Sequence, residues 1–153
     1  MITLTDIGPE QLREVLALRV EEAQAAFVPT PEGILARAWA YRGEGARMYA
    51  IRAEGMMAGL ALLYELTEEP ACYCVMELLV DYRYQNQGIA TEALRQILQI
   101  CGHEGKYPVV ELSVDRRNEH ALRVCEKAGF VDAGYVDPAL PQYRNMIYKL
   151  PPV

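Results

Sequence analysis

Residues 76–90 read MELLVDYRYQNQGIA and join an apolar run to a helical pattern. The run that ends at Val80 is typical of a buried strand. Beyond Gly88, apolar residues recur at steps of three and four, which predicts an amphipathic helix. The first turn of a helix carries free backbone N–H groups and the positive end of the helix dipole. A strand, a tight turn and a helix start in this order therefore predict an anion site.

The turn itself is the hexapeptide Gln85, Asn86, Gln87, Gly88, Ile89 and Ala90. The missing side chain of Gly88 lets a phosphate oxygen approach the backbone, and the small Ala90 leaves the same path clear. The amides of Gln85 and Asn86 add neutral donors, which suits a diphosphate held mainly by backbone N–H groups. The turn is not a P-loop, because no lysine follows the glycine, and it lacks the three glycines of a dinucleotide fingerprint. Taken alone, it is also compatible with an ordinary strand-to-helix turn.

Length and composition predict one domain that spans residues 1–153. The chain is 52% apolar, which is enough for a hydrophobic core, and it contains no repeat or linker that would mark a boundary. No apolar run is long enough to cross a membrane and the first residues lack the pattern of a signal peptide, so we expect a cytoplasmic protein. The net charge of -6 disfavours nucleic acid and mildly favours a basic partner, although it also serves simply to keep a protein dispersed.

The four cysteines are expected to be reduced, because nothing in the sequence indicates a secreted protein. Cys72 and Cys74 share one face of a predicted strand, and Cys101 and His103 flank a glycine. Zinc is the alternative, but these spacings fit none of the usual ligand pairs. We therefore expect no metal.

Hydrophobic periodicity predicts the order β, α, α, β, β, β, α, β, α, β, β, a mixed sheet with helices on both faces. The first helix opens at residues 8–10, has apolar residues as far as Val20, and is followed by a second at about 31–41. The helix after Gly88 is expected to end before Gly102, and another covers 118–128 with Gly129 as its left-handed cap. The expected strands are 2–7, 48–53, 57–64, 71–80, 108–114, 130–136 and 145–150, with a hairpin turn at Glu54-Gly55.

Two patterns in register carry a specific resemblance. Gln85-x-x-Gly88-x-Ala90, directly after its strand, resembles the (Arg/Gln)-x-x-Gly-x-(Gly/Ala) signature of the GNAT superfamily of acetyl-CoA-dependent N-acetyltransferases. Downstream, Asn118-x-x-Ala121 followed by Lys-Ala-Gly-Phe is similar to that family's second motif. The resemblance covers nearly the whole chain and implies the GNAT fold, an α/β fold of about six to seven mostly antiparallel strands.

The resemblance also implies how acetyl-CoA is held. In such enzymes a strand backbone, here that of Leu78, Leu79 and Val80, pairs with the pantetheine arm and helps to hold the acetyl carbonyl. The turn 85–90 would cradle the pyrophosphate, while Asn118 and Lys127 complete the residues expected to contact the cofactor. Asn118 has an alternative role as a plain helix N-cap.

Glu77 is the expected catalytic base. A primary amine has a pKa near 10.4, so freeing its lone pair at pH 7 costs about 4 to 5 kcal/mol and a base is useful. Glu77 is a lone carboxylate in an apolar run, where desolvation raises its pKa. In relatives, however, the base often points to the other face of the strand, the face to which Cys74 and Met76 are expected to point. Only a bulge in the strand would turn Glu77 to that face. The alternative is a structural ion pair with an arginine on a neighbouring strand.

The general acid is the clearest departure from the family pattern. Many relatives have a tyrosine where this chain has Cys125, whose thiol could donate a proton to the leaving thiolate or could simply face the core. Tyr135, Tyr143 or Tyr148 are alternatives, and the thiolate can also leave without a dedicated acid.

The acceptor is the least constrained part of the prediction. Residues 19–28, 57–64 and the amide turn resemble bacterial spermine/spermidine acetyltransferases, and Glu21 and Glu22 could join Glu77 in binding a polyamine. The alternatives are that Glu21 and Glu22 form a solvated helix face, that the acceptor is a peptide N-terminus or an amino sugar, and that the protein is a non-catalytic coenzyme-binding module. Related folds often pair, so a homodimer is expected.

Overall fold

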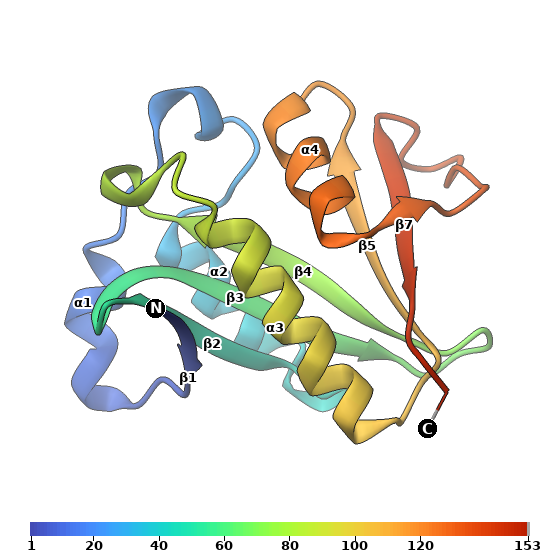
Figure 1. Cartoon of the computed structure of the whole chain (residues 1–153), viewed down its shortest axis with the longest axis horizontal. Coiled ribbons are helices and arrows are strands. Elements are labelled where there is room, and N and C mark those ends of the chain that lie inside the picture. The colour runs from blue at the N-terminus through green and yellow to red at the C-terminus, as the bar shows by residue number, and fades with distance from the viewer. Residues whose placement is uncertain (153) are drawn as a thin grey trace.

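The computed structural model describes residues 1–152, and it forms one seven-stranded sheet with helices on both faces (Figure 1). The elements follow the predicted order, with short 3-10 turns before or between several of them. They are β1 (Ile2–Thr5), α1 (Leu12–Leu16), α2 (Pro31–Ala40), β2 (Arg47–Ala53), β3 (Met56–Leu66), β4 (Cys72–Val80), α3 (Ile89–Glu104), β5 (Val109–Asp115), α4 (Glu119–Ala128), β6 (Val131–Asp132) and β7 (Tyr143–Lys149).

The strands lie in the order β1-β2-β3-β4-β5-β7-β6. Every neighbouring pair is antiparallel except β4 and β5, which run parallel. A parallel pair needs a crossover connection, and α3 provides it. The predicted fold class is therefore confirmed, including the predominance of antiparallel pairs.

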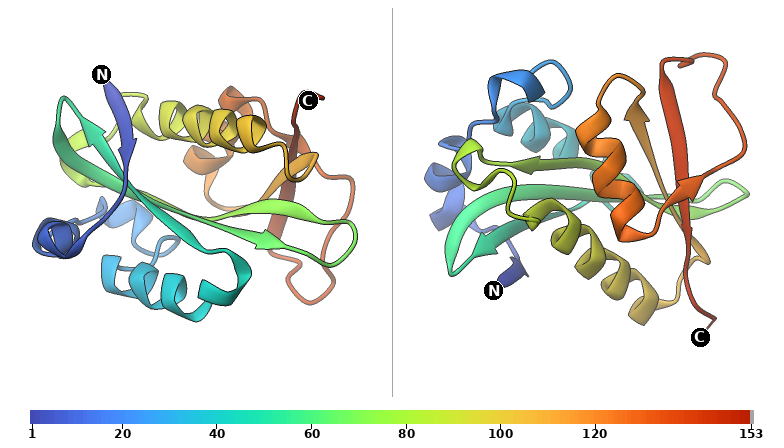
Figure 2. Two further views of the ribbon diagram at one scale, coloured as in Figure 1. Left: turned by 90° about the horizontal axis from the view of Figure 1, so that it is seen from below. Right: turned by 45° about the horizontal axis from the view of Figure 1, so that its top comes forward.

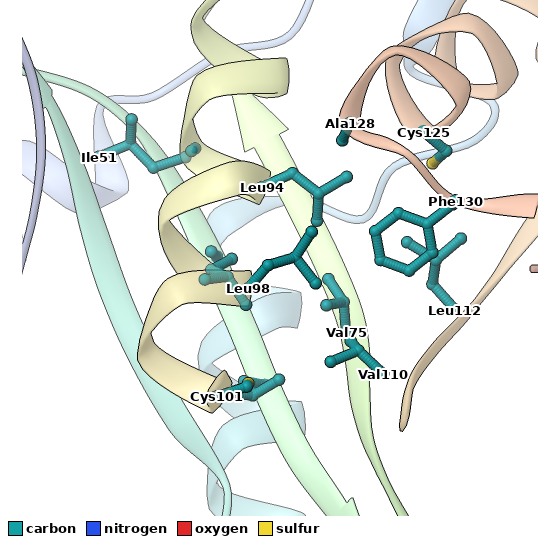
Figure 3. Packing of buried hydrophobic residues seen from close by; sticks show 14 of the residues in the cluster. Ile51, Val75, Leu94, Leu98, Cys101, Val110, Leu112, Cys125, Ala128 and Phe130 are labelled. Carbon is teal, nitrogen blue, oxygen red and sulfur yellow. The ribbon is translucent and has the colours of Figure 1, made fainter. Parts of the chain in front are cut away.

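The sheet separates two hydrophobic clusters. Helices α3 and α4 cover one face, called here the α3 face, and α1 and α2 cover the other, called the α2 face (Figure 2). On the α3 face, Leu94 and Leu98 of α3 pack with Val75 of β4 and Val110 of β5 (Figure 3). On the α2 face, Leu60 and other residues of β3 pack with residues of α1 and α2. Side chains of a strand alternate between these clusters, so the cluster to which a residue belongs gives its facing.

The first helix is shorter than the sequence predicts. It ends at Leu16, and residues 17–21 lead away from it instead of completing about one more turn. The backbone groups that a longer helix would use are bound elsewhere, because the N–H of Arg19 donates to Asp81 and its carbonyl accepts from Tyr82. A contact distant in sequence therefore overrides the local helical pattern.

Two further boundaries differ from the prediction by more than two residues. Helix α3 runs through Gly102 to Glu104 and is capped by Gly105, because the Glu104 carboxylate binds Arg47 and Tyr73 and so holds an extra turn. The strand expected at 130–136 shrinks to the two residues of β6, because Gly134 adopts a positive φ and turns the chain away. The hairpin at Glu54-Gly55 and the cap at Gly129 are confirmed, both with left-handed backbone.

None of the helices described in residues 1–152 is both long and apolar enough to traverse a lipid bilayer.

Candidate functional site

The parallel strands β4 and β5 separate soon after they meet. They pair only at Tyr73 with Val110 and at Cys74 with Glu111, and beyond these residues the two strands diverge (Figure 1). A cavity of about 510 Å³ lies at this opening. Its lining includes Leu78 from the α3 face and Glu77 from the α2 face, so the cavity has walls on both faces of the sheet. A volume of this size fits a small-molecule site.

One end of the cavity is lined by the amide turn. Asn86 has a φ of 59° and Gly88 a φ of 73°, and these two left-handed residues fold the chain directly into α3. None of the backbone N–H groups from residue 86 to residue 91 donates a hydrogen bond to another residue in the described part of the chain. A run of free amides at a helix N-terminus is suited to an anion, as expected.

Gln85 stabilises this turn from within. Its Nε2 donates to the Val80 carbonyl at 2.7 Å, so the side chain ties the start of the turn back to the end of β4. Val80 is followed by Asp81, whose buried carboxylate accepts the backbone N–H of Arg83 at 3.0 Å. Hydrogen bonds within the chain therefore fasten the start of the turn to the end of β4.

A β-bulge decides which way Glu77 faces. Leu62 of β3 pairs with Glu77, but the next residue, Leu63, pairs with Val75, so Met76 is an extra residue on β4. Leu62 belongs to the cluster under α1 and α2, while Leu63 and Val75 belong to the cluster under α3. Glu77 therefore faces α1 and α2, in phase with Cys74. The sequence could not decide whether this strand contains a bulge, and the structure shows that it does.

Glu77 is a carboxylate without a hydrogen-bond partner. Its Oε2 is buried and makes no hydrogen bond in the described structure. Burial raises the pKa of Glu77 to about 7, and the positive charge of Arg37 on α2 opposes this rise only in part. No arginine of a neighbouring described strand pairs with Glu77, so the alternative of a structural ion pair has no support. A carboxyl group with a pKa near neutrality can accept a proton from an amine at physiological pH.

Cys125 lines the cavity from α4. It is 6% exposed, and burial raises the pKa of its thiol to about 12. Of the three tyrosines considered as replacements, only Tyr143 lines the cavity. Tyr135 binds Glu111 instead, and Tyr148 packs against Phe130.

Asn118 both caps α4 and lines the cavity. Its Oδ1 accepts the N–H of Ala121 at 3.2 Å, which is the N-cap contact that the sequence offered as an alternative. Its amide nitrogen donates to no other residue in the described chain, so the cap leaves a donor for a ligand.

Several predicted residues lie away from the cavity lining. Among the predicted cofactor contacts, Leu79 is buried under α1 and α2, Gln87 is exposed at the tip of the turn, and Lys127 is exposed on the last turn of α4. Glu21 and Glu22 are exposed, and neither lines the cavity. The structure therefore brings Glu77, Leu78, Val80, most of the turn, Asn118 and Cys125 together, and leaves these five outside.

The side of the cavity between the α1–α2 segment and β7, where the acceptor is expected, is called here the acceptor wall. It contains Phe27 and Leu140, which the sequence did not single out, and Tyr143, which the sequence offered only as an alternative acid. Phe27 lines the cavity from the segment between α1 and α2, and Leu140 and Tyr143 line it from the segment before β7 and from its start. The one sequence signal for Phe27 was its place in residues 19–28, the segment that resembles bacterial spermine/spermidine acetyltransferases. Asp115, at the end of β5, also lines the cavity.

The described residues contain no group of three or more His, Cys, Asp or Glu side chains arranged to hold a metal ion. The four cysteines are free and buried, with 3.8 Å between the sulfurs of Cys72 and Cys74.

Strands β4 and β5 part around a cavity that has free amides at one end and a carboxylate without a partner on the α2 face. This arrangement suits the transfer of a group between two substrates. A sequence model of the Acetyltransferase (GNAT) family matches residues 12–130, and the chain belongs to that family. The probable N-acetyltransferase YjcK of Bacillus subtilis is 31% identical over 78 residues, which are 51% of this chain. The match spans 43% of that relative's length.

Solved structures share the fold at low sequence identity. Spermidine N-acetyltransferase from Vibrio cholerae, in complex with CoA and spermine, superposes with a TM-score of 0.75 at 16% identity, covering 97% of this chain and 95% of that one. Aminoglycoside acetyltransferase AAC(6')-Ib with coenzyme A gives 0.78 at 18% identity, with the same coverage of both chains. The ribosomal-protein-S18-alanine N-acetyltransferase from Escherichia coli gives 0.68 at 21%, covering 99% of this chain and 94% of that one.

Proposed function

We propose that the protein transfers the acetyl group of acetyl-CoA to a primary amine, with Glu77 as the base. The observation that carries this proposal is the unpartnered Oε2 of Glu77 beside a cavity that reaches the free amides of the turn. Family membership and the coenzyme complexes of the structural relatives support the same conclusion.

The coenzyme is proposed to bind along the opening of the sheet. The free N–H groups of residues 86–91 meet its pyrophosphate, and Asn118 offers its amide nitrogen. The edge of β4 that turns away from β5 beyond Cys74 leaves backbone groups around Leu78 and Val80 for the pantetheine arm. Such pairing resembles the addition of a strand to a sheet edge.

In the proposed reaction, Glu77 takes a proton from the ammonium group of the acceptor, directly or through a water molecule. The free amine attacks the thioester carbonyl, a C–N bond forms, and the C–S bond then breaks. Backbone N–H groups of β4 stabilise the oxyanion, and no covalent enzyme intermediate is needed. The products are an amide and the coenzyme thiolate, which takes up the remaining proton.

Cys125 is proposed to relay that last proton, because its thiol can protonate the coenzyme thiolate and then take up the proton that the new amide loses. Its contribution is small. A thiol with a pKa of about 12 stays protonated at neutral pH but releases its proton reluctantly to a thiolate of lower basicity. Tyr143, the other hydroxyl or thiol group considered in the lining, is the second candidate.

A polyamine is the acceptor favoured by the sequence, and the fold shared with the spermidine enzyme supports it. The exposed positions of Glu21 and Glu22 weigh against it. A peptide N-terminus and an amino sugar are the other acceptors, supported by the fold shared with the S18-alanine and aminoglycoside enzymes. A homodimer and a cytoplasmic location remain predictions.

The test combines the purified protein, acetyl-CoA and a panel of amines, with thiol release as the readout. We expect release with at least one amine and loss of about 99% of the rate in Glu77→Gln, since general base catalysis contributes about 10²-fold or more. Glu21→Gln is the matched control, because it removes an exposed carboxylate outside the cavity. Coenzyme binding without thiol release on any amine would identify a non-catalytic module.

A further inference from the structure

The wall of the cavity on the α2 face is poor in negative charge. Two carboxylates line the cavity within the described chain, Glu77 and Asp115, together with one histidine, His120. An acceptor with several ammonium groups needs one carboxylate for each group that it buries, since an unpaired buried charge is costly. The number of free carboxylates therefore limits the charge of the acceptor.

Asp115 is already neutralised by Arg117. The Arg117 side chain donates through Nε at 3.1 Å and through an Nη at 2.9 Å, and its backbone N–H adds a third bond at 2.9 Å. These bonds lower the pKa of Asp115 to about 2 and pair its negative charge with the guanidinium group of Arg117. Glu77 is the single carboxylate in the described lining that has no cationic partner.

Arg117 also occupies an aromatic face that could otherwise bind a cation. Its guanidinium carbon lies 5.6 Å from the centre of the Phe27 ring. The positive charge of Arg37, on α2, acts on Glu77 from the same side of the sheet. A second ammonium group on the acceptor would be repelled by these two nearby cations and would find no free carboxylate in the described lining.

The remaining wall is apolar. Met76 packs under α1 and α2, and so do Val20 and Val28, and all three line the cavity. Tyr143 lies on the same face, since it is three residues from Met146, which packs on the α3 face, and side chains of a strand alternate. This wall would bind an uncharged hydrocarbon or aromatic group as the part of the acceptor beyond its amine.

From this distribution of charge we propose that the acceptor is a monoamine, in which one primary ammonium group meets Glu77 and the rest of the molecule is uncharged and apolar. The inference rests on the proposed function for its site, and it names a monoamine in place of a polyamine as the acceptor. It assigns to Arg117 the role of a specificity residue that neutralises Asp115.

The experiment compares n-hexylamine with 1,6-diaminohexane, which have the same chain length and differ in one ammonium group. Binding to the protein–coenzyme A complex is measured by calorimetry, and turnover is measured separately by thiol release. We expect hexylamine to bind at least about tenfold more tightly, a difference of about 1.4 kcal/mol. Equal affinity, tighter binding of the diamine, or binding of neither amine overturns the inference. If the ranking holds but no amine of the panel is acetylated, the proposed function fails, while the preference of this site for a single ammonium group stands.

Two variants sharpen the comparison. Arg117→Gln frees the Asp115 carboxylate, and we expect the preference for hexylamine to fall at least threefold because the diamine gains a partner. The double variant Glu21→Gln/Glu22→Gln is the control and should leave the ratio of affinities unchanged, because both side chains are exposed outside the cavity. Selective loss of diamine binding in the double variant would instead support a polyamine site.

Discussion

The carboxylate of Asp81 accepts the backbone N–H of Arg19 at 3.0 Å, and the Arg19 carbonyl accepts the N–H of Tyr82 at 2.7 Å. Asp81 is fully buried and follows β4 directly, just before the amide turn. Arg19 begins the segment that forms the acceptor wall. These bonds therefore join the proposed coenzyme side of the cavity to its acceptor side.

Asp81→Ala is expected to destabilise the protein by about 2 to 4 kcal/mol, because it leaves the backbone N–H groups of Arg19 and Arg83 without their partner and removes the ion pair with Arg83. Urea denaturation at pH 7 measures this loss. Asp6→Ala, which changes an exposed aspartate, is the control and should stay within about 0.5 kcal/mol of the unsubstituted protein. A loss below 1 kcal/mol in Asp81→Ala would contradict the role of Asp81 as the link.

The contribution of Asp81 to the stability of the fold is expected to be lost in acid. Burial tends to raise the pKa of Asp81, but hydrogen bonds from Arg83 and Arg19 outweigh burial and lower it. A carboxyl group whose folded pKa is lowered contributes its full stability above its unfolded pKa of about 3.9 and loses it as the pH falls toward the folded value. The stability difference between the unsubstituted protein and Asp81→Asn should therefore shrink below about pH 4. Denaturation curves between pH 3 and pH 7 provide the measurement.

The ionisation of Glu77 is expected to determine how the rate of turnover depends on pH. Its carboxyl group has a pKa of about 7 and is an effective base only when ionised. The ratio of kcat/KM between the unsubstituted protein and Glu77→Gln should rise with pH to a midpoint near 7 and then level off. The ratio is the useful quantity, because the ionisation of the amine substrate cancels. A ratio that stays constant from pH 5.5 to pH 9 would exclude Glu77 as the base.

Alanine substitutions at Gly88 and Gly55 can be compared to distinguish an effect on coenzyme binding from an effect of backbone strain. Gly88 and Gly55 both have positive φ values, 73° and 80°, and a Cβ added at either meets nothing within 4 Å. Alanine at either position should cost about 1 kcal/mol of stability. Only Gly88→Ala should also weaken acetyl-CoA binding, by about tenfold, because Gly88 lines the cavity and Gly55 does not. Calorimetry with coenzyme A tests this, and equal affinities in the two variants would remove the turn from the coenzyme site.

Local patterns were sufficient for the order of elements and for the amide turn, because both depend on residues close in sequence. The bulge at Met76 was beyond such patterns, since it is a property of the pairing between β4 and β3. The early end of α1 likewise depends on Asp81, which lies 62 residues from Arg19. The charge balance of the acceptor wall depends on Arg117, which binds Asp115 within one turn of the chain but meets Phe27 only because two distant segments come together. Contacts between distant segments therefore decide the orientation of the base and the acceptor, while local sequence decides the coenzyme side.

Cys125 provides a test of how the coenzyme thiolate is protonated. Because burial holds the pKa of its thiol at about 12, Cys125 is a weak donor, and Cys125→Ser should lower kcat by less than about tenfold. Serine keeps the size of the side chain, so the variant changes the donor with little change in packing. Tyr143→Phe is the comparison, since it removes a hydroxyl group that also lines the cavity. Steady-state kinetics at pH 8 measures both variants; a drop of 100-fold or more in Cys125→Ser alone would make the thiol the principal acid despite its high pKa.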